Sequence, residues 1–237
     1  MRTRNHRLIQ PHARIVPLLQ QARLWEPTKI NSVNVDARLI CALLERWRPE
    51  THTFILPTGE CTITLEDVHM LLGLKVDGIP VTIEREITWD YFEDFLGKQM
   101  EDIEKSRKTV KLKWLSSYMT ELSDDPRPEA VVYHFRVYCL YIIGTLLMPD
   151  TTGNKVHIKW LALLDKNPEE IGEYSWGSAC LAWLYRGMCD AAHTQVHDVP
   201  GCTLLIQAWA YSRILAIAPV PKKYISSEFP FANMWVK

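Results

Sequence analysis

The sequence predicts a mainly α-helical, compact multi-helix domain with one small β-hairpin. Apolar residues in the first half of the 237-residue chain recur every three or four positions, as in helices that bury one face. The second half holds long segments that are apolar on every side, which indicates helices at the centre of a protein. A period of two occurs in residues 53–64, where Pro57–Glu60 supplies the turn of a hairpin.

Two helices are predicted after a basic arm at residues 1–14. Residues 15–24 have helical apolar spacing, and Pro27 would end that helix. Asn34 can cap the second helix and Pro49 can stop it. One apolar stripe lies between them, made of Val35, Leu39, Ile40, Leu43, Leu44 and Trp47.

A short capped helix follows the hairpin. Thr64 and Asp67 have the spacing of a capping box, and Gly73 can close the helix in the left-handed conformation. Another helix is predicted over residues 89–96. Residues 98–111 are the most polar stretch and are interpreted as a loop or insert.

The second half begins after a Pro-rich break at residues 123–128, a candidate boundary between two subdomains. Four apolar helices are then expected, at residues 129–148, 160–164, 175–193 and 203–218. From residue 219 to residue 237 Pro, Lys and Ser return. We interpret this stretch as a C-terminal extension that leaves the core.

Composition excludes several classes of protein. With 27 Lys and Arg against 28 Asp and Glu, the net charge is -1, so no global positive field attracts nucleic acid or an anionic membrane. The six cysteines form no Cys-x-x-Cys pair and are typical of reduced thiols in the cytosol or nucleus. The longest apolar run, Val137–Met148, is shorter than the roughly 20 residues of a membrane span. We therefore expect a core helix there and no membrane contact.

Motifs of common enzymes are missing from the sequence. It has neither G-x-G-x-x-G nor a P-loop. Gly172–Gly177 has one residue too many for a nucleophile elbow, so Ser175 is interpreted as a helix N-cap. Lys155, Lys159 and Lys166 stand without a phosphate cup for pyridoxal phosphate. We expect no cofactor, no catalytic residue and no aminotransferase or phosphatase activity.

One group of residues is a candidate metal site. Cys189, His193 and His197 are spaced four apart, so on a continuous helix they share a face, and a thiolate with two imidazoles suits zinc. The alternative, which we favour, is that the helix ends near His193 and the histidines are surface residues.

Nucleic-acid binding has two candidate segments. They are the arm with Arg2, Arg4, Arg7 and Arg14, and the stretch from Lys105 to Lys113. We favour the alternative that both are solvated faces of a chain with balanced charge.

The second half also contains arginines within apolar helices, namely Arg136, Arg186 and Arg213. A buried guanidinium requires a partner. We predict a structural buried ion pair between Arg186 and Asp190, with Glu173 or a carboxylate of another helix as alternatives. On that premise, Arg186→Ala would destabilise the fold.

Four ordered blocks resemble the plant mobile domain. They are Pro57–Gly78, Leu147–His157, Tyr174–Cys189 and Leu204–Ala210. Trp176, Gly177, Tyr185 and Trp209 stand in the last two blocks and form a candidate interaction or core signature. On this resemblance, the domain covers residues 15–218, and the extension is truncated relative to the family.

The resemblance implies a largely helical nuclear protein. The family, often labelled aminotransferase-like, includes Maintenance of Meristems proteins and long forms joined to a phosphatase resembling protein phosphatase 7. It also occurs in transposable elements. The implied role is transposon silencing, regulation of gene expression, genome integrity and meristem maintenance with a phosphatase-like partner. The family offers no catalytic residues to carry over.

Three functions therefore remain open. The first is a non-enzymatic protein-interaction domain whose specificity resides in an exposed aromatic or apolar surface. The second is a transposon-derived protein associated with nucleic acid. The third is an enzyme of unknown class that uses Cys189, His193 and His197.

Overall fold

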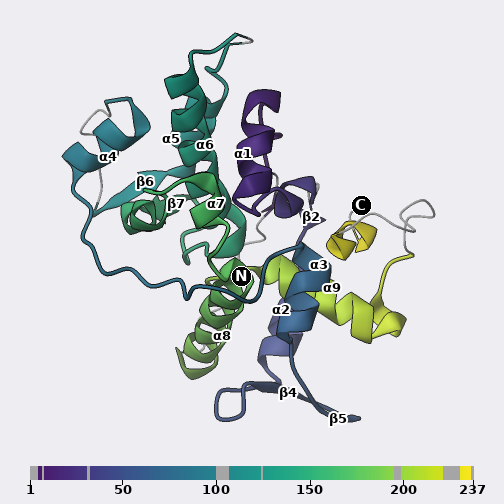
Figure 1. Ribbon diagram of the computed structural model, residues 1–237. Helices are drawn as coiled ribbons and strands as arrows, with labels where there is room; N and C mark the ends of the chain where they lie inside the picture. The colour runs from purple at the N-terminus through teal and green to yellow at the C-terminus, as the bar shows by residue number, and fades with distance from the viewer. Residues whose placement is uncertain are drawn as a thin grey trace.

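The computed structural model describes residues 5–6, 8–30, 33–99, 107–123, 125–194, 199–220 and 230–235. Helices dominate these residues, and short antiparallel strands join them (Figure 1). The predicted fold class, mainly α with a small hairpin, is confirmed. One continuous apolar core runs from Leu8 to Trp235.

The first helices differ from the prediction at their ends. After a 3₁₀ turn at Ala13–Ile15, α1 spans Val16–Gln21, and α2 spans Ala37–Leu44. The N-cap of α2 is Asp36, whose carboxylate accepts from the amide of Arg38 at 2.8 Å. The prediction that Asn34 caps this helix was wrong, because Asn34 lies in β2 (Val33–Asn34), which pairs with β1 (Asn5–His6).

The hairpin is confirmed and carries a third strand. β4 (Thr53–Leu56) and β5 (Gly59–Cys61) pair with Phe54 opposite Cys61. β3 (Trp47–Arg48) adds to the other edge of β4. Trp47 therefore belongs to a strand, although its spacing continues the stripe of α2.

Both capped helices are confirmed. α3 spans Leu65–Leu72, and its capping box is complete. The carboxylate of Asp67 accepts from the amide of Thr64 at 2.8 Å, and the amide of Asp67 donates to the hydroxyl of Thr64. Gly73 closes α3 at φ 71°, a conformation that favours glycine. α4 spans Trp89–Leu96, the predicted range.

The polar stretch at 98–111 leads into structure that the sequence pattern did not predict. Residues 100–106 lie outside the described part. β6 (Thr109–Lys111) pairs with β7 (Lys155–His157), and α5 follows at Leu112–Met119. The link between α5 and α6 covers residues 120–127, of which residue 124 lies outside the described part. The subdomain boundary at 123–128 stays a prediction, as do the limits 15–218 and 219–237. The expectation that the C-terminal extension leaves the core is wrong for Phe231–Trp235, where Ala232 and Trp235 are buried in the apolar core.

The apolar helices of the second half are present. They are α6 (Pro128–Ile142), a π-helical continuation (Ile143–Leu147), a 3₁₀ helix (Ile158–Leu163), α7 (Pro168–Ile171), α8 (Trp176–Thr194), α9 (Thr203–Arg213) and 3₁₀ turns at Leu215–Ile217 and Phe231–Trp235. The stretch Pro128–Leu147 is long and apolar enough to span a membrane, but it is mostly buried inside the protein. That burial fits the predicted core helix.

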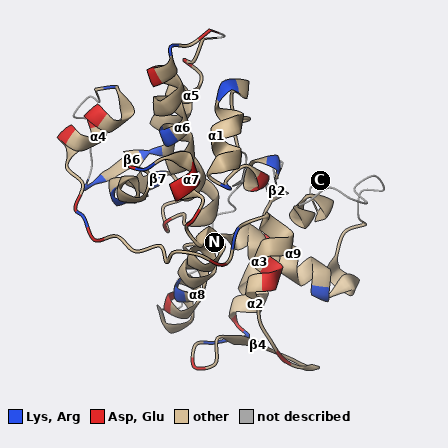
Figure 2. Cartoon of the chain, in the orientation of Figure 1, with Lys and Arg blue, Asp and Glu red and all other residues tan. Residues whose placement is uncertain are grey.

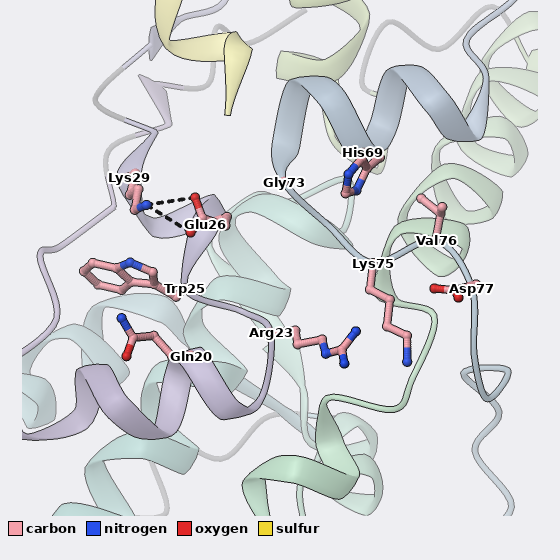
Figure 3. Close-up of a pocket in the computed structure, with 10 residues that line it drawn as sticks. All are labelled: Gln20, Arg23, Trp25, Glu26, Lys29, His69, Gly73, Lys75, Val76 and Asp77. Atoms are coloured by element: carbon pink, nitrogen blue, oxygen red, sulfur yellow. Dashed lines mark hydrogen bonds and ion pairs between the residues drawn. The ribbon is translucent and has the colours of Figure 1, made fainter. Parts of the chain in front are cut away.

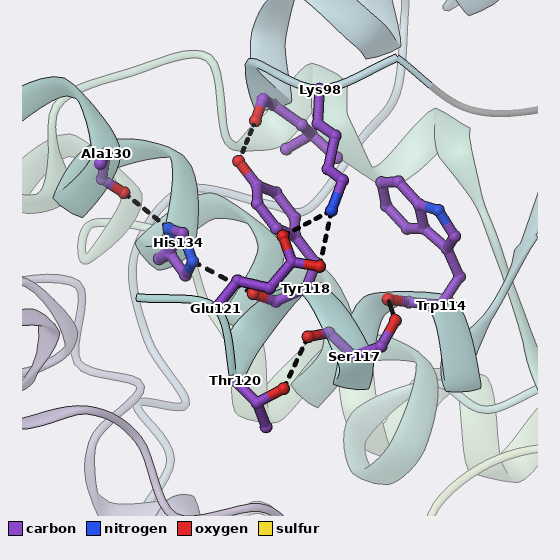
Figure 4. Close-up of polar contacts among 9 residues, drawn as sticks. Lys98, Trp114, Ser117, Tyr118, Thr120, Glu121, Ala130 and His134 are labelled. Carbon is purple, nitrogen blue, oxygen red and sulfur yellow. Dashed lines mark hydrogen bonds and ion pairs between the residues drawn. The ribbon is translucent and has the colours of Figure 1, made fainter. Parts of the chain in front are cut away.

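The α5–α6 contact shows how this interior treats polar groups (Figure 4). The hydroxyl of Tyr118 donates to the carbonyl of Leu96 at 2.8 Å, and burial raises the pKa of Tyr118 to about 12. The two ring nitrogens of buried His134 lie 2.8 and 3.1 Å from the carbonyl oxygens of Ala130 and Tyr118. A backbone carbonyl thus accepts from the buried Tyr118 hydroxyl, and a neutral His134 ring donates to one of its two neighbouring carbonyls.

An extended segment at residues 75–79 positions the start of α8. The chain leaves α3 and runs past the start of α8 before it reaches α4 on the other side of the molecule (Figure 1). The carbonyl of Lys75 accepts from the amide of Gly177 at 2.7 Å, and the carbonyl of Ile79 accepts from the amide of Ser175 at 2.9 Å. We call this segment the 75–79 clamp.

The clamp also corrects the predicted role of Ser175. Its hydroxyl donates to the carbonyl of Ile79 at 3.1 Å, so it joins α8 to the clamp. Ser178 makes a second such bond, to the carbonyl of Val76 at 2.5 Å. The first turn of α8 is therefore bound to a segment about one hundred residues earlier.

Gly177→Ala tests the closeness of the clamp. An added Cβ would stand 2.8 Å from Val76 Cγ1 and 2.9 Å from the Lys75 carbonyl oxygen. We expect a loss of about 1–3 kcal/mol in the free energy of unfolding, measured by urea denaturation, although alanine is the better helix former. Ala182→Gly on the exposed face of α8 is the control and should lose only about 1 kcal/mol. A Gly177→Ala protein as stable as the wild type would contradict the close contact.

Candidate functional site

The signature residues Trp176, Gly177 and Trp209 on α8 and α9 are buried, and Tyr185 is half-buried. Trp176 is fully buried and donates its indole N–H to the carbonyl of Ile171 at 2.9 Å. Tyr185 donates to the carbonyl of Ile63 at 2.5 Å, which fixes α8 to the end of the hairpin. Trp209 is buried and stacks on Phe54 at 5.0 Å between ring centroids. With Gly177 against the clamp, these residues hold elements together.

The Arg186–Asp190 pair is not buried, so that prediction was wrong. The Nε and Oδ2 atoms are 4.0 Å apart, and the side chains are 79% and 67% exposed. The reason is that α8 is not apolar on every side. Ala182, Arg186 and Asp190, spaced by four, form an exposed stripe along the helix. Such a pair contributes little to stability.

The buried carboxylate belongs instead to Asp67. Its side chain is 10% exposed and accepts from the guanidinium of Arg213 at 2.7 Å, which joins α3 to α9. Asp67 also completes the capping box with Thr64. One carboxylate thus links the start of one helix to the end of another.

The candidate zinc group remains a prediction. α8 ends at Thr194, as the alternative interpretation expected, and His193 is exposed near that end. Cys189 is half-buried and accepts from the Trp47 indole N–H at 3.4 Å. His197 lies outside the described residues. Within the described ranges, no three His, Cys, Asp or Glu side chains are arranged to hold a metal ion.

Three of the thiols, those of Cys61, Cys139 and Cys180, are poorly suited to nucleophilic chemistry. All six cysteines are free. Burial raises the pKa of Cys139. A side-chain hydrogen bond with Cys202, together with burial, raises the pKa of Cys180. The pKa of Cys61 is raised by burial too. Each of these shifts disfavours the reactive thiolate.

The basic stretch is partly engaged within the chain. Lys108 donates to the carbonyl of Ile87 at 2.8 Å and pairs with Glu86 at 3.0 Å. In the view of Figure 2, cationic and anionic segments are interspersed over the elements. Arg2, Arg4, Arg7 and Lys105 lie outside the described side chains, so the nucleic-acid hypothesis stays untested there.

A pocket of about 570 Å³ lies between the end of α1 and the end of α3. We call it the α1–α3 pocket, and Figure 3 shows it lined by Arg23, Trp25, Glu26, Lys29, Lys75 and Asp77 among others. Most of its charges are already paired. Lys29 forms an ion pair with Glu26 at 2.9 Å, and Lys75 forms one with Glu173 at 3.2 Å.

The charges left over in this pocket have opposite signs. Arg23 and Asp77 are exposed and have no ion pair among the described residues. Arg23 adopts φ 52°, a left-handed conformation that is uncommon for a residue with a side chain. With one cation and one anion unpaired, the pocket has no preference for a ligand of either sign.

A second cavity, of about 370 Å³, lies against the exposed face of α8. We call it the α8 groove and define it by Val81, Ile83, Lys159, Trp160, Trp183 and Arg186. Met148, Ala179 and Ala182 complete its wall. This lining contains two cations, two indoles and aliphatic side chains, and it contains no carboxylate.

Lys159 lies over both indoles of the groove. Its Nζ is 4.9 Å from the centroid of Trp160 and 5.3 Å from that of Trp183. Burial, and then the positive charge of Arg186, lower the pKa of Lys159. Sequence reasoning considered Lys159 only for pyridoxal phosphate. The spacing of Ala179, Trp183 and Arg186 marks one wall, but nothing local connects Lys159 with it.

Asp67→Ala tests the link between α3 and α9. Removing the carboxylate leaves the amide of Thr64 without its cap and Arg213 without its partner. We expect a loss of about 1–3 kcal/mol in the free energy of unfolding. Arg213→Gln should cost less than about 1 kcal/mol because that side chain is 58% exposed. Equal losses in the two variants would mean that the ion pair, and not the cap, dominates.

Arg186→Gln tests the electrostatics of the α8 groove. Removing a neighbouring positive charge should raise the pKa of Lys159, so its acetylation rate should reach half-maximum at higher pH. Mass spectrometry measures that profile, with Lys113 on α5 as an internal reference. Because Arg186 is exposed, the free energy of unfolding should stay within about 0.5 kcal/mol of the wild type. An unchanged profile would refute the coupling of the two cations.

The comparisons with known proteins agree with the resemblance. Protein MAIN-LIKE 2 of Arabidopsis thaliana is 37% identical over 222 residues, and Protein MAINTENANCE OF MERISTEMS of the same plant is 37% identical over 223 residues. Each match covers 93% of this chain. Serine/threonine-protein phosphatase 7 long form homolog, also from Arabidopsis thaliana, is 39% identical over 207 residues, or 87% of the chain.

The chain spans less than half the length of these relatives. The matched segments are 33%, 46% and 15% of the three proteins, in the order given. No solved structure matches the chain. The sequence model of the plant mobile domain matches residues 24–237. The chain belongs to the plant mobile domain family.

Proposed function

We propose that this chain is a non-enzymatic protein-interaction domain that works in the nucleus with a phosphatase-like partner. Its role is in transposon silencing, regulation of gene expression, genome integrity and meristem maintenance. The observation that carries the proposal is the share of each relative's length that the matched segment occupies. One and the same segment is 15% of one relative and 46% of another.

A segment that stands in proteins of such different length is a portable unit. Portable domains contribute binding, while other parts of each protein contribute further activities. One of these relatives is named as a phosphatase long form homolog. Because that relative is named for a phosphatase, we infer that a phosphatase-like chain is the partner of this domain.

The geometry is consistent with this role. Trp176, Tyr185 and Trp209 are engaged in the interior, which leaves the exterior for partners. The α8 groove is lined by aliphatic side chains, by half-buried Trp183 and by two cations. Such a mixture of apolar and cationic side chains is found at interaction sites. Conversely, interspersed charges favour the protein-interaction role over the nucleic-acid alternative.

Affinity purification from plant nuclei tests the proposal. We expect the tagged chain, expressed in Arabidopsis thaliana, to localise to the nucleus and to recover a phosphatase-7-like chain, identified by mass spectrometry. The control is the tag expressed alone, which should recover no phosphatase-like chain. A folded, nuclear wild-type chain that enriches no phosphatase-like protein over the tag alone would contradict the proposal.

A further inference from the structure

We infer that the α8 groove binds an extended peptide segment of a partner protein in which an acidic side chain stands next to an aliphatic one. This inference rests on the proposed interaction function and specifies the surface and the chemistry that the partner presents. Its first ground is the charge of the lining, which holds Lys159 and Arg186 and no carboxylate.

Lys159 is a half-buried cation without a carboxylate partner. No carboxylate among the described residues forms an ion pair with its ammonium group, which lies over two indoles. By comparison, the buried hydroxyl of Tyr118 donates to the carbonyl of Leu96 at 2.8 Å. The faces of Trp160 and Trp183 compensate the charge of Lys159 only in part.

A second cation lies near Lys159, which makes the arrangement less favourable without an anion. Arg186 is close enough to lower the pKa of Lys159. Its contact with Asp190 is long, at 4.0 Å, and both groups are solvent-exposed. Two like charges that line one groove repel each other, and a ligand carboxylate between them would relieve that repulsion.

The rest of the groove is aliphatic. Val81 and Ile83 line the groove beside a tight turn, in which the amide of Thr82 donates to the carbonyl of Pro80 at 3.1 Å. Ile79, two residues before Val81, is 49% exposed and adds apolar surface to the same segment. A peptide would place its aliphatic side chain against this surface while its carboxylate reaches Lys159.

The same features argue against a single-stranded nucleic acid. Base stacking needs an exposed aromatic face, but Trp160 is 6% exposed and packs edge-to-face with Trp183 at 5.7 Å. Lys159 already lies over both rings. A phosphate backbone also requires a track of cations, and the groove has two.

The experiment selects binding peptides from a random phage-displayed library on the folded, full-length chain. The best peptide is synthesised with a fluorescent label, and its Kd is measured by fluorescence polarisation. We expect the selected sequences to combine Asp or Glu with Leu, Ile or Val. Replacing the acidic residue of the peptide by its amide should weaken binding about tenfold or more.

Protein variants then locate the site. Lys159→Met keeps the apolar stem over the indoles and removes the charge, and it should weaken binding about tenfold. Arg186→Gln changes an exposed side chain, so the variant should fold as the wild type does. It should weaken peptide binding about two- to fivefold. Lys113→Met, an exposed cation of α5, is the matched control and should bind as the wild type does.

Three outcomes would overturn the inference. They are selected peptides without acidic residues, peptide binding unaffected by both groove variants, and tighter Lys159-dependent binding of a single-stranded DNA oligonucleotide. Recovery of a phosphatase-like partner by a Lys159→Met/Arg186→Gln double variant at the wild-type level would overturn the groove and leave the proposed function standing. Acidic-peptide binding at the groove without recovery of any phosphatase-like chain would support the groove inference and contradict the proposed partner.

Discussion

The fold depends on the backbone hydrogen bonds between the 75–79 clamp and the first turn of α8. The amides of Ser175 and Gly177 donate to carbonyls of the clamp, so the start of this helix is set by main-chain contacts and not by a side-chain cap. Gly177 permits the approach because it has no Cβ. From that fixed start α8 directs Tyr185 toward the hairpin and leaves Arg186 in solvent.

Several polar side chains in the interior are paired, although the buried indole nitrogens of Trp209 and Trp235 have no hydrogen-bond partner among the described residues. Arg136 donates to the carbonyl of Phe95 at 3.0 Å and lies over the ring of Phe95 at 3.8 Å, while burial lowers its pKa. Tyr138 donates to the carbonyl of Ile9 at 2.6 Å, and burial raises its pKa. These groups serve packing. Lys159 has aromatic contacts but no such acceptor among the described residues, which distinguishes a groove from a core.

Sequence reasoning succeeded where the physics is local. The capping box of Thr64 and Asp67 and the left-handed Gly73 act within a few residues, so their pattern alone located α3. It failed where tertiary contacts decide. α5 follows a polar stretch and is held by α6, and Arg186 was assigned to the core because its helix is rich in apolar residues. Periodicity predicts that one face is buried; it does not predict how wide the solvent-exposed face is.

The same limit explains why the candidate site escaped sequence analysis while the family did not. The blocks that carry the resemblance meet in the interior: the clamp contacts the start of α8, and the carbonyl of Pro149 accepts from the amide of Gly201 at 2.9 Å and from the Trp183 indole at 3.2 Å. Residues held in that way identify the fold. The groove draws its walls from three separate segments, around Val81, around Lys159 and on the open face of α8. Only the folded chain places those segments together, so the chemistry available to a partner is a property of tertiary structure.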